Sequence, residues 1–202
     1  MVRKVWIICG VLSVILLGAV ALRLSAIKGN TADSSSQNAV VAGAPVGGPF
    51  SLVNAAGESV TNNTFANKYK LIFFGFTWCP SVCPTELSKM ADVLDLLGAE
   101  ANKIAPLFIT IDPERDTPAI MGEYTSKFDP RIIGLAGSRD QINTVLKSYK
   151  VYAAKVPSED GNYTMDHSSF MYLMSPDDQL LTLYRAEEKP SGIVADLRPR
   201  LK

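Results

Sequence analysis

This 202-residue chain contains one histidine and three cysteines, the side chains best suited to binding a soft metal ion or acting as nucleophiles. The single histidine, His167, stands in the run MDHSS, and two of the three cysteines, Cys79 and Cys83, stand in the run FTWCPSVCP. Cysteine thiolates select Cu(I), zinc or iron–sulfur clusters, and imidazole suits copper and zinc. Two thiols and one imidazole therefore predict a soft metal site.

The number of available ligands narrows the choice of metal. Cu(I) can be satisfied by three ligands, whereas a structural zinc site needs a fourth. The remaining cysteine, Cys9, lies inside an apolar N-terminal run, where a small apolar filler is the ordinary role of this residue type. The sequence after that run offers no further cysteine or histidine, so the ligand set favours copper.

The same two cysteines also allow thiol–disulfide chemistry. Three residues separate Cys79 from Cys83, one more than in a thioredoxin-type redox motif. One turn of chain permits the Cα separation of about 4.4 to 6.8 Å that a disulfide needs, so reversible oxidation is compatible with the spacing. A purely structural disulfide is the weaker interpretation, because closing so small a loop removes little entropy from the unfolded chain.

A helix is expected to begin at this motif. Pro84 is at ease at the first helical position, which makes Cys83 the expected N-cap and places Glu86 in the first turn. The positive end of the helix would then lower the pKa of the Cys83 thiol. Both metal capture and disulfide exchange use a thiolate.

Strand-like and helix-like patterns alternate along the rest of the chain. Their order predicts an α/β, thioredoxin-like fold, in which helices flank a central mixed sheet and a short hairpin comes first. The expected strands cover residues 50–53, 59–61, 69–76, 105–111, 132–135, 170–174 and 180–185. The expected helices cover 86–97 and 191–201, and two more begin at Thr117-Pro118 and at a capping box from Ser138 to Gln141.

The predicted elements bring the candidate ligands toward one edge of the sheet. Cys79 and Cys83 follow the buried strand 69–76, and open α/β sheets place their ligand sites at the carboxyl ends of strands. His167 precedes the strand 170–174, so we expect it on a loop that faces the cysteines if the two strands are neighbours.

The N-terminal region predicts a membrane anchor. Val5 to Leu22 is eighteen residues without a charge, which as a helix spans about 27 Å. A cleaved signal peptide is the alternative, but Arg23 follows directly and no small-x-small cleavage site is evident. We therefore expect an anchor over residues 1–24, a flexible linker over 25–48 and one domain over 49–202.

Charge and topology indicate where the domain works. Residues 29–202 hold 16 basic and 20 acidic side chains, and this net charge of −4 argues against nucleic-acid binding. A short basic start before an apolar run leaves the body translocated. We expect the domain in a bacterial periplasm, with the mitochondrial intermembrane space as the alternative.

Three motifs, FTWCPSVCP, TIDPERDTP and DHSSFMYLMSPD, follow the apolar segment in this order. Together they resemble the Sco/SenC family of copper chaperones for cytochrome c oxidase, over roughly residues 45–202. The resemblance implies that Cys79, Cys83 and His167 bind copper, as Cu(I) or also Cu(II), for delivery to the binuclear copper centre of cytochrome c oxidase subunit II. It also implies that the dithiol could reduce the cysteines of that subunit, and that other copper chaperones or thiol reductases are partners.

Two carboxylates are candidates for orienting the imidazole. Metal-bound histidines commonly donate their second ring N–H to a carboxylate or a carbonyl. Asp166 directly precedes His167, and Asp112 opens the motif DPERDTP. Ordinary turn and helix-start chemistry explains both aspartates equally well.

A second function of a different class stays open on the sequence. The chain could be an enzyme, a thiol-disulfide oxidoreductase or thiol peroxidase that uses the Cys79 and Cys83 pair. His167 is dispensable in that case, whereas a copper chaperone needs it. A redox or copper sensor is a third possibility that no sequence feature favours.

Overall fold

The computed structural model describes residues 45–158 and 161–201. The expected anchor, residues 1–24, and most of the expected linker lie outside the described residues. Within the described ranges, no helix combines the length and the apolar character needed to cross a bilayer.

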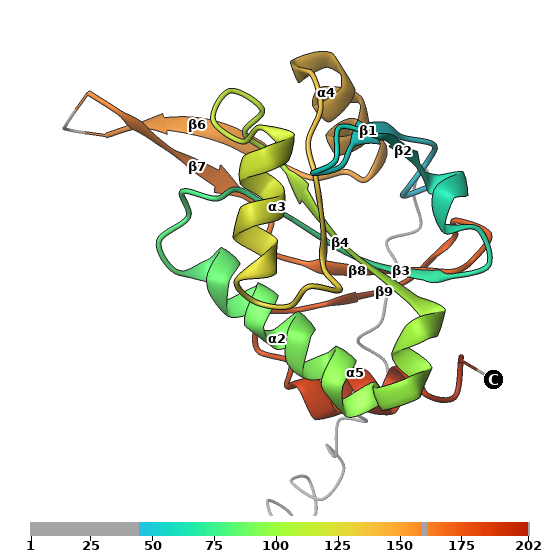
Figure 1. The fold of residues 1–202 in the computed structure, drawn as a ribbon. Helices are drawn as coiled ribbons and strands as arrows, with labels where there is room; N and C mark the ends of the chain where they lie inside the picture. The colour runs from blue at the N-terminus through green and yellow to red at the C-terminus, as the bar shows by residue number, and fades with distance from the viewer. Residues whose placement is uncertain (1–44, 159–160, 202) are drawn as a thin grey trace, which may run out of the picture. The chain divides into compact units, whose positions relative to one another are not determined.

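A five-stranded mixed sheet forms the centre, in the order β5-β4-β3-β8-β9 (Figure 1). Strands β3 (Tyr69–Gly75), β4 (Ile104–Thr110) and β5 (Ile133–Leu135) are parallel. Strand β8 (Met171–Met174) runs antiparallel to β3, and β9 (Leu180–Tyr184) runs antiparallel to β8. All of β4 and all of β3 except its first residue are buried, as expected for strands covered on both faces. The predicted thioredoxin-like arrangement of the sheet is confirmed.

The described residues also form four helices and two short 3-10 helices. The elements are α2 (Val82–Leu97), α3 (Pro118–Ser126), α4 (Arg139–Ser148), α5 (Pro190–Leu197), η1 (Asn62–Phe65) and η2 (Gly98–Lys103). Figure 1 shows α2 and α5 side by side, and α3 packs beside β5. The start signals of two helices are confirmed: Thr117 Oγ1 accepts a hydrogen bond from the backbone N–H of Ile120, and Ser138 and Gln141 form the capping box.

The start of α2 differs from the sequence prediction. Ser81 is the N-cap, so Cys83 and Pro84 occupy the second and third helical positions, not the N-cap and the first. The first N–H groups of a helix have no partner within it, so proline is tolerated there without loss of a hydrogen bond. This freedom is why Pro84 alone does not fix the first residue of the helix.

Two hairpins flank the sheet, and only one was predicted. Strands β1 (Ser51–Val53) and β2 (Ser59–Thr61) pair antiparallel, as expected. Strands β6 (Ala153–Pro157) and β7 (Tyr163–His167) form the second hairpin. Their side chains are exposed or half-buried, so neither strand has the continuous apolar run that marks a buried strand in a sequence. His167 is consequently the last residue of a strand, paired with Ala153, and not a loop residue.

Candidate metal centre

The fold brings Cys79, Cys83 and His167 together. One ligand atom from each of the three residues lies within 4.8 Å of the other two, and Cys83 Sγ is 3.9 Å from His167 Nε2. Both cysteines are free thiols. With metal–ligand bonds of about 2.0 to 2.3 Å, the donors of a three-coordinate site lie about 3.5 to 4 Å apart, so little movement separates this arrangement from a metal-binding one.

The tautomer of His167 leaves one ring nitrogen free for a ligand. Its Nδ1 is 2.9 Å from the carbonyl oxygen of Ser168. A carbonyl oxygen can only accept, so Nδ1 carries the proton and Nε2 presents its lone pair toward the Cys83 sulfur. The ring packs edge-on against Phe73 and Phe76, with centroids 6.3 and 5.9 Å away, which holds its plane.

The Ser168 carbonyl accepts a hydrogen bond from the second ring N–H of His167, a role for which the sequence suggested Asp112 or Asp166. Asp112 is buried, and its carboxylate accepts hydrogen bonds from the Tyr163 hydroxyl at 2.8 Å and from the Arg115 Nε–H. Asp166 is exposed, because alternate residues of β7 point to opposite faces and His167 takes the inner one. Neither carboxylate is the hydrogen-bond partner of Nδ1.

The two thiols differ in acidity, in the opposite sense to the sequence prediction. The pKa of Cys79 is lowered to about 3, first by a hydrogen bond from the Cys83 thiol, and further by the backbone N–H of Cys83, whose nitrogen lies 3.3 Å from the sulfur. The pKa of Cys83 is raised by that same hydrogen bond, by burial and by repulsion from Cys79 and Asp116. Cys79 is therefore the thiolate and Cys83 the protonated thiol.

A buried aspartate that sequence reasoning missed fixes the start of the cysteine loop. Asp116 accepts hydrogen bonds from the backbone N–H of Thr77 at 3.2 Å and from the hydroxyls of Thr77 and Thr110, each at 2.6 Å. Its residue exposure is 1%. The sequence could have suggested this contact, because Thr77 follows β3 and Asp116 follows β4, and neighbouring parallel strands end at the same edge of the sheet.

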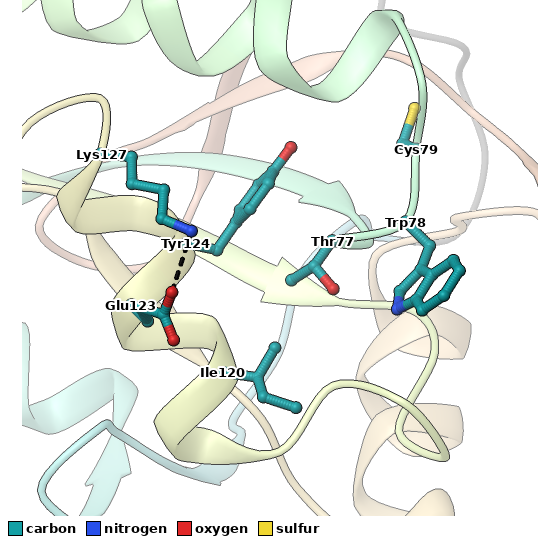
Figure 2. A pocket seen from close by; sticks show the side chains of 7 residues that line it. All are labelled: Thr77, Trp78, Cys79, Ile120, Glu123, Tyr124 and Lys127. Carbon is teal, nitrogen blue, oxygen red and sulfur yellow. Dashed lines mark ion pairs between the residues drawn. The ribbon is translucent and has the colours of Figure 1, made fainter.

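Cys79 is the thiol that reaches a surface pocket. Figure 2 shows this pocket, of about 420 Å³, between the cysteine loop and α3. The loop contributes Thr77, Trp78 and Cys79, and α3 contributes Ile120, Glu123, Tyr124 and Lys127. Trp78 is 63% exposed and Ile120 is 41% exposed, whereas Cys83 is fully buried. A partner molecule therefore meets the site at Cys79 first.

Comparison with known proteins agrees with this geometry. The model of a family described as SCO1/SenC matches residues 39–202. Protein SCO1 homolog 1, mitochondrial, from Arabidopsis thaliana is 41% identical over 160 residues, which cover 77% of this chain and 48% of that protein. The chain thus spans about half the length of this curated relative.

Solved structures show the same fold. ScoI of Bradyrhizobium japonicum with copper bound superposes with a TM-score of 0.72 at 46% identity, over 76% of this chain and 98% of that one. BsSco, described as a member of the Sco family of cytochrome c oxidase assembly proteins with a disulfide switch, superposes with a TM-score of 0.61 at 27% identity, over 78% of this chain and 95% of that one.

Proposed function

Because this chain belongs to the SCO1/SenC family, we propose that it is a membrane-tethered copper metallochaperone that delivers copper to subunit II of cytochrome c oxidase. Copper is its cargo, held by Cys79, Cys83 and His167. The observation that carries the proposal is the convergence of two thiol sulfurs and one imidazole nitrogen within 4.8 Å of one another.

The chemistry of the donor set fits copper. Two sulfurs and one nitrogen are soft to intermediate donors, and Cu(I) can be coordinated by three such ligands. The Cys79 thiolate and the Nε2 lone pair are ready to bind, whereas Cys83 must release its proton to the incoming ion or to solvent. Uptake of copper should therefore release about one proton from each site at neutral pH.

The difference in exposure between the two thiols suggests how copper leaves. A cysteine of the acceptor would enter at the pocket and displace Cys79 first, since Cys83 is fully buried. The acceptor's further ligands would then replace His167 and Cys83 in turn. Such an exchange keeps the copper bound throughout and transfers no electrons.

The free thiol pair supports reduction of the acceptor's cysteines as an additional or alternative function. The Cys79 thiolate would attack a disulfide of the partner, forming a mixed disulfide and releasing one partner thiolate. Cys83 would then lose its proton and attack Cys79 Sγ, which releases the second partner thiolate. The two electrons come from the dithiol, which ends as a disulfide.

We place the domain in the periplasm, tethered by an anchor over residues 1–24 and a linker over 25–48, with the domain itself over 49–202. The uncharged run from Val5 to Leu22 supports the anchor. Tethering would raise the effective concentration of the domain near a membrane-bound acceptor.

Complementation separates the two functions. A strain that lacks this protein and oxidase activity would receive the unsubstituted chain, His167→Ala, Cys79→Ser, or Lys147→Ala as a control at an exposed position on α4. Copper delivery predicts that both site variants fail and the control rescues. Full rescue by His167→Ala, with failure of Cys79→Ser, would instead favour the thiol-reductase function.

A further inference from the structure

The hairpin β6–β7 lies outside the central sheet, yet it carries His167 at the end of its second strand (Figure 1). A two-stranded hairpin is at best marginally stable by itself. Contacts with the rest of the domain must therefore hold β7 in the place where His167 meets the thiols. Tyr163, at the opposite end of β7, faces the same side as His167, because the two residues are four positions apart and side chains alternate between the faces of a strand.

Arg115 makes the main contacts with that opposite end. It stands in the loop between β4 and α3, and its Nη1–H donates to the backbone carbonyl of Tyr163 at 2.9 Å. Its guanidinium carbon lies 3.8 Å from the centroid of the Tyr163 ring, a stacked cation–π contact. Its Nε–H donates to Asp112, whose other carboxylate oxygen accepts from the Tyr163 hydroxyl. Arg115 thus holds the β7 end of the hairpin to the loop, while Lys155 on β6 forms an ion pair with Glu114 of the same loop.

The same guanidinium also reaches the aromatic side chains beside the cysteines. Its carbon lies 5.4 Å from the ring centroid of Trp78, the residue before Cys79, and 5.8 Å from that of Phe76. Phe76 in turn packs edge-on against His167. Arg115 therefore contacts residues next to both halves of the candidate metal centre.

This position requires arginine and not merely a positive charge. The Nη2 atom is buried with no hydrogen-bond partner, and the aromatic faces around the guanidinium are its neighbours. A planar guanidinium can stack on a ring while two of its N–H groups point to separate acceptors. A lysine ammonium cannot do both.

We propose that Arg115 is a positioning residue that holds the β6–β7 hairpin so that His167 stays at the thiols. The inference rests on the proposed function only where it speaks of copper. In the metal-free chain it predicts that Arg115 controls the order of β7.

Hydrogen–deuterium exchange on the metal-free, full-length chain tests this directly. Arg115→Lys should make the amides of β7 exchange at least tenfold faster, while β3 and β4 keep their protection. Tyr163→Leu should act in the same direction, and the effects of the two changes should add only in part, because both remove the stacking of the guanidinium on the Tyr163 ring. Arg198→Lys is the matched control, since Arg198 also links separate elements, through Glu100 and the Leu96 carbonyl.

Copper coordination gives the second measurement. Pulsed EPR of the Cu(II)-loaded chain reports imidazole nitrogen, and we expect Arg115→Lys to lose at least half of that signal while Arg198→Lys keeps it. Unchanged protection of β7, or full imidazole ligation in Arg115→Lys, would overturn the proposal. Equal loss of protection in β3 and β4 would also overturn it, because Arg115 would then only stabilise the fold. If the unsubstituted chain binds copper without imidazole, the proposed function fails, and the exchange measurement still decides the role of Arg115.

Discussion

Cys83 Sγ and His167 Nε2 lie 3.9 Å apart although the two residues are 84 positions apart in the sequence. The pairing of β3 with β8 explains this contact. β8 runs antiparallel to β3, with Met171 opposite Phe73, so the chain enters β8 at the edge where β3 ends. The cysteine loop leaves the sheet at that same edge.

We predict that Gly75→Ala disturbs the site. A Cβ at this position would lie 2.6 Å from Cys83 Sγ and 2.8 Å from Cε2 of Phe108. Such overpacking should cost about 1 to 3 kcal/mol of unfolding free energy and displace the Cys83 sulfur. Denaturant unfolding and copper titration measure the two effects. Gly192→Ala is the control, since its Cβ meets nothing within 4 Å, and equal behaviour of the two variants would contradict this prediction.

Asp116→Asn should loosen the cysteine loop. The N–H and hydroxyl of Thr77 and the hydroxyl of Thr110 all donate to this carboxylate. In the variant, the side-chain NH₂ replaces one of the two accepting oxygens, and a donor cannot accept these hydrogen bonds. We expect a loss of about 1 to 3 kcal/mol of unfolding free energy together with weaker copper binding. Thermal unfolding and copper competition with a chelator check both. Asp177→Asn, at an exposed position, should change neither.

The two thiols should differ in their alkylation by iodoacetamide. Since the pKa of Cys79 is lowered from its ordinary value to about 3, this thiol is already ionised at pH 5, and its rate should stay flat to pH 8. An ordinary thiol such as glutathione, added as an internal control, should react about tenfold faster per pH unit over the same range. Cys83, with its raised pKa and full burial, should stay unmodified. Peptide mass spectrometry resolves the sites, and a rate at Cys79 that climbs with pH as glutathione does would refute the assignment.

Much of the fold could be predicted because its elements bury regular apolar patterns. The runs that became β3 and β4 are almost continuously apolar, and the capping box at Ser138 and Gln141 marks the start of α4 through local hydrogen bonds alone. The three candidate ligands were identifiable because they are the only residues of their types after the apolar N-terminal run.

The rest depends on contacts that no local pattern encodes. Strand β7 is held from outside by Arg115 and Asp112, and its five residues alternate between half-buried and exposed without the continuous apolar run of β3 and β4. The acidity of the thiols follows from which sulfur is buried and which receives hydrogen bonds, and not from the helix start alone. The partner of His167 is a backbone carbonyl, a group that every residue possesses.

Copper should stabilise the folded chain. At a free Cu(I) concentration 100 times the dissociation constant, binding to the native state alone adds about 2.7 kcal/mol to the unfolding free energy. Thermal unfolding under anaerobic conditions, with and without Cu(I), should show this gain as a higher Tm. Because Cys83→Ser removes one sulfur, the gain should shrink by more than half, and an equal rise in that variant would contradict its role as a ligand.

The most direct test of the account is X-ray absorption on the Cu(I)-loaded chain, with His167→Ala beside it. We predict two sulfur neighbours and one nitrogen neighbour for copper in the unsubstituted chain, and loss of the nitrogen with weaker binding in the variant. Identical spectra and equal affinity in the two proteins would contradict the three-ligand copper site.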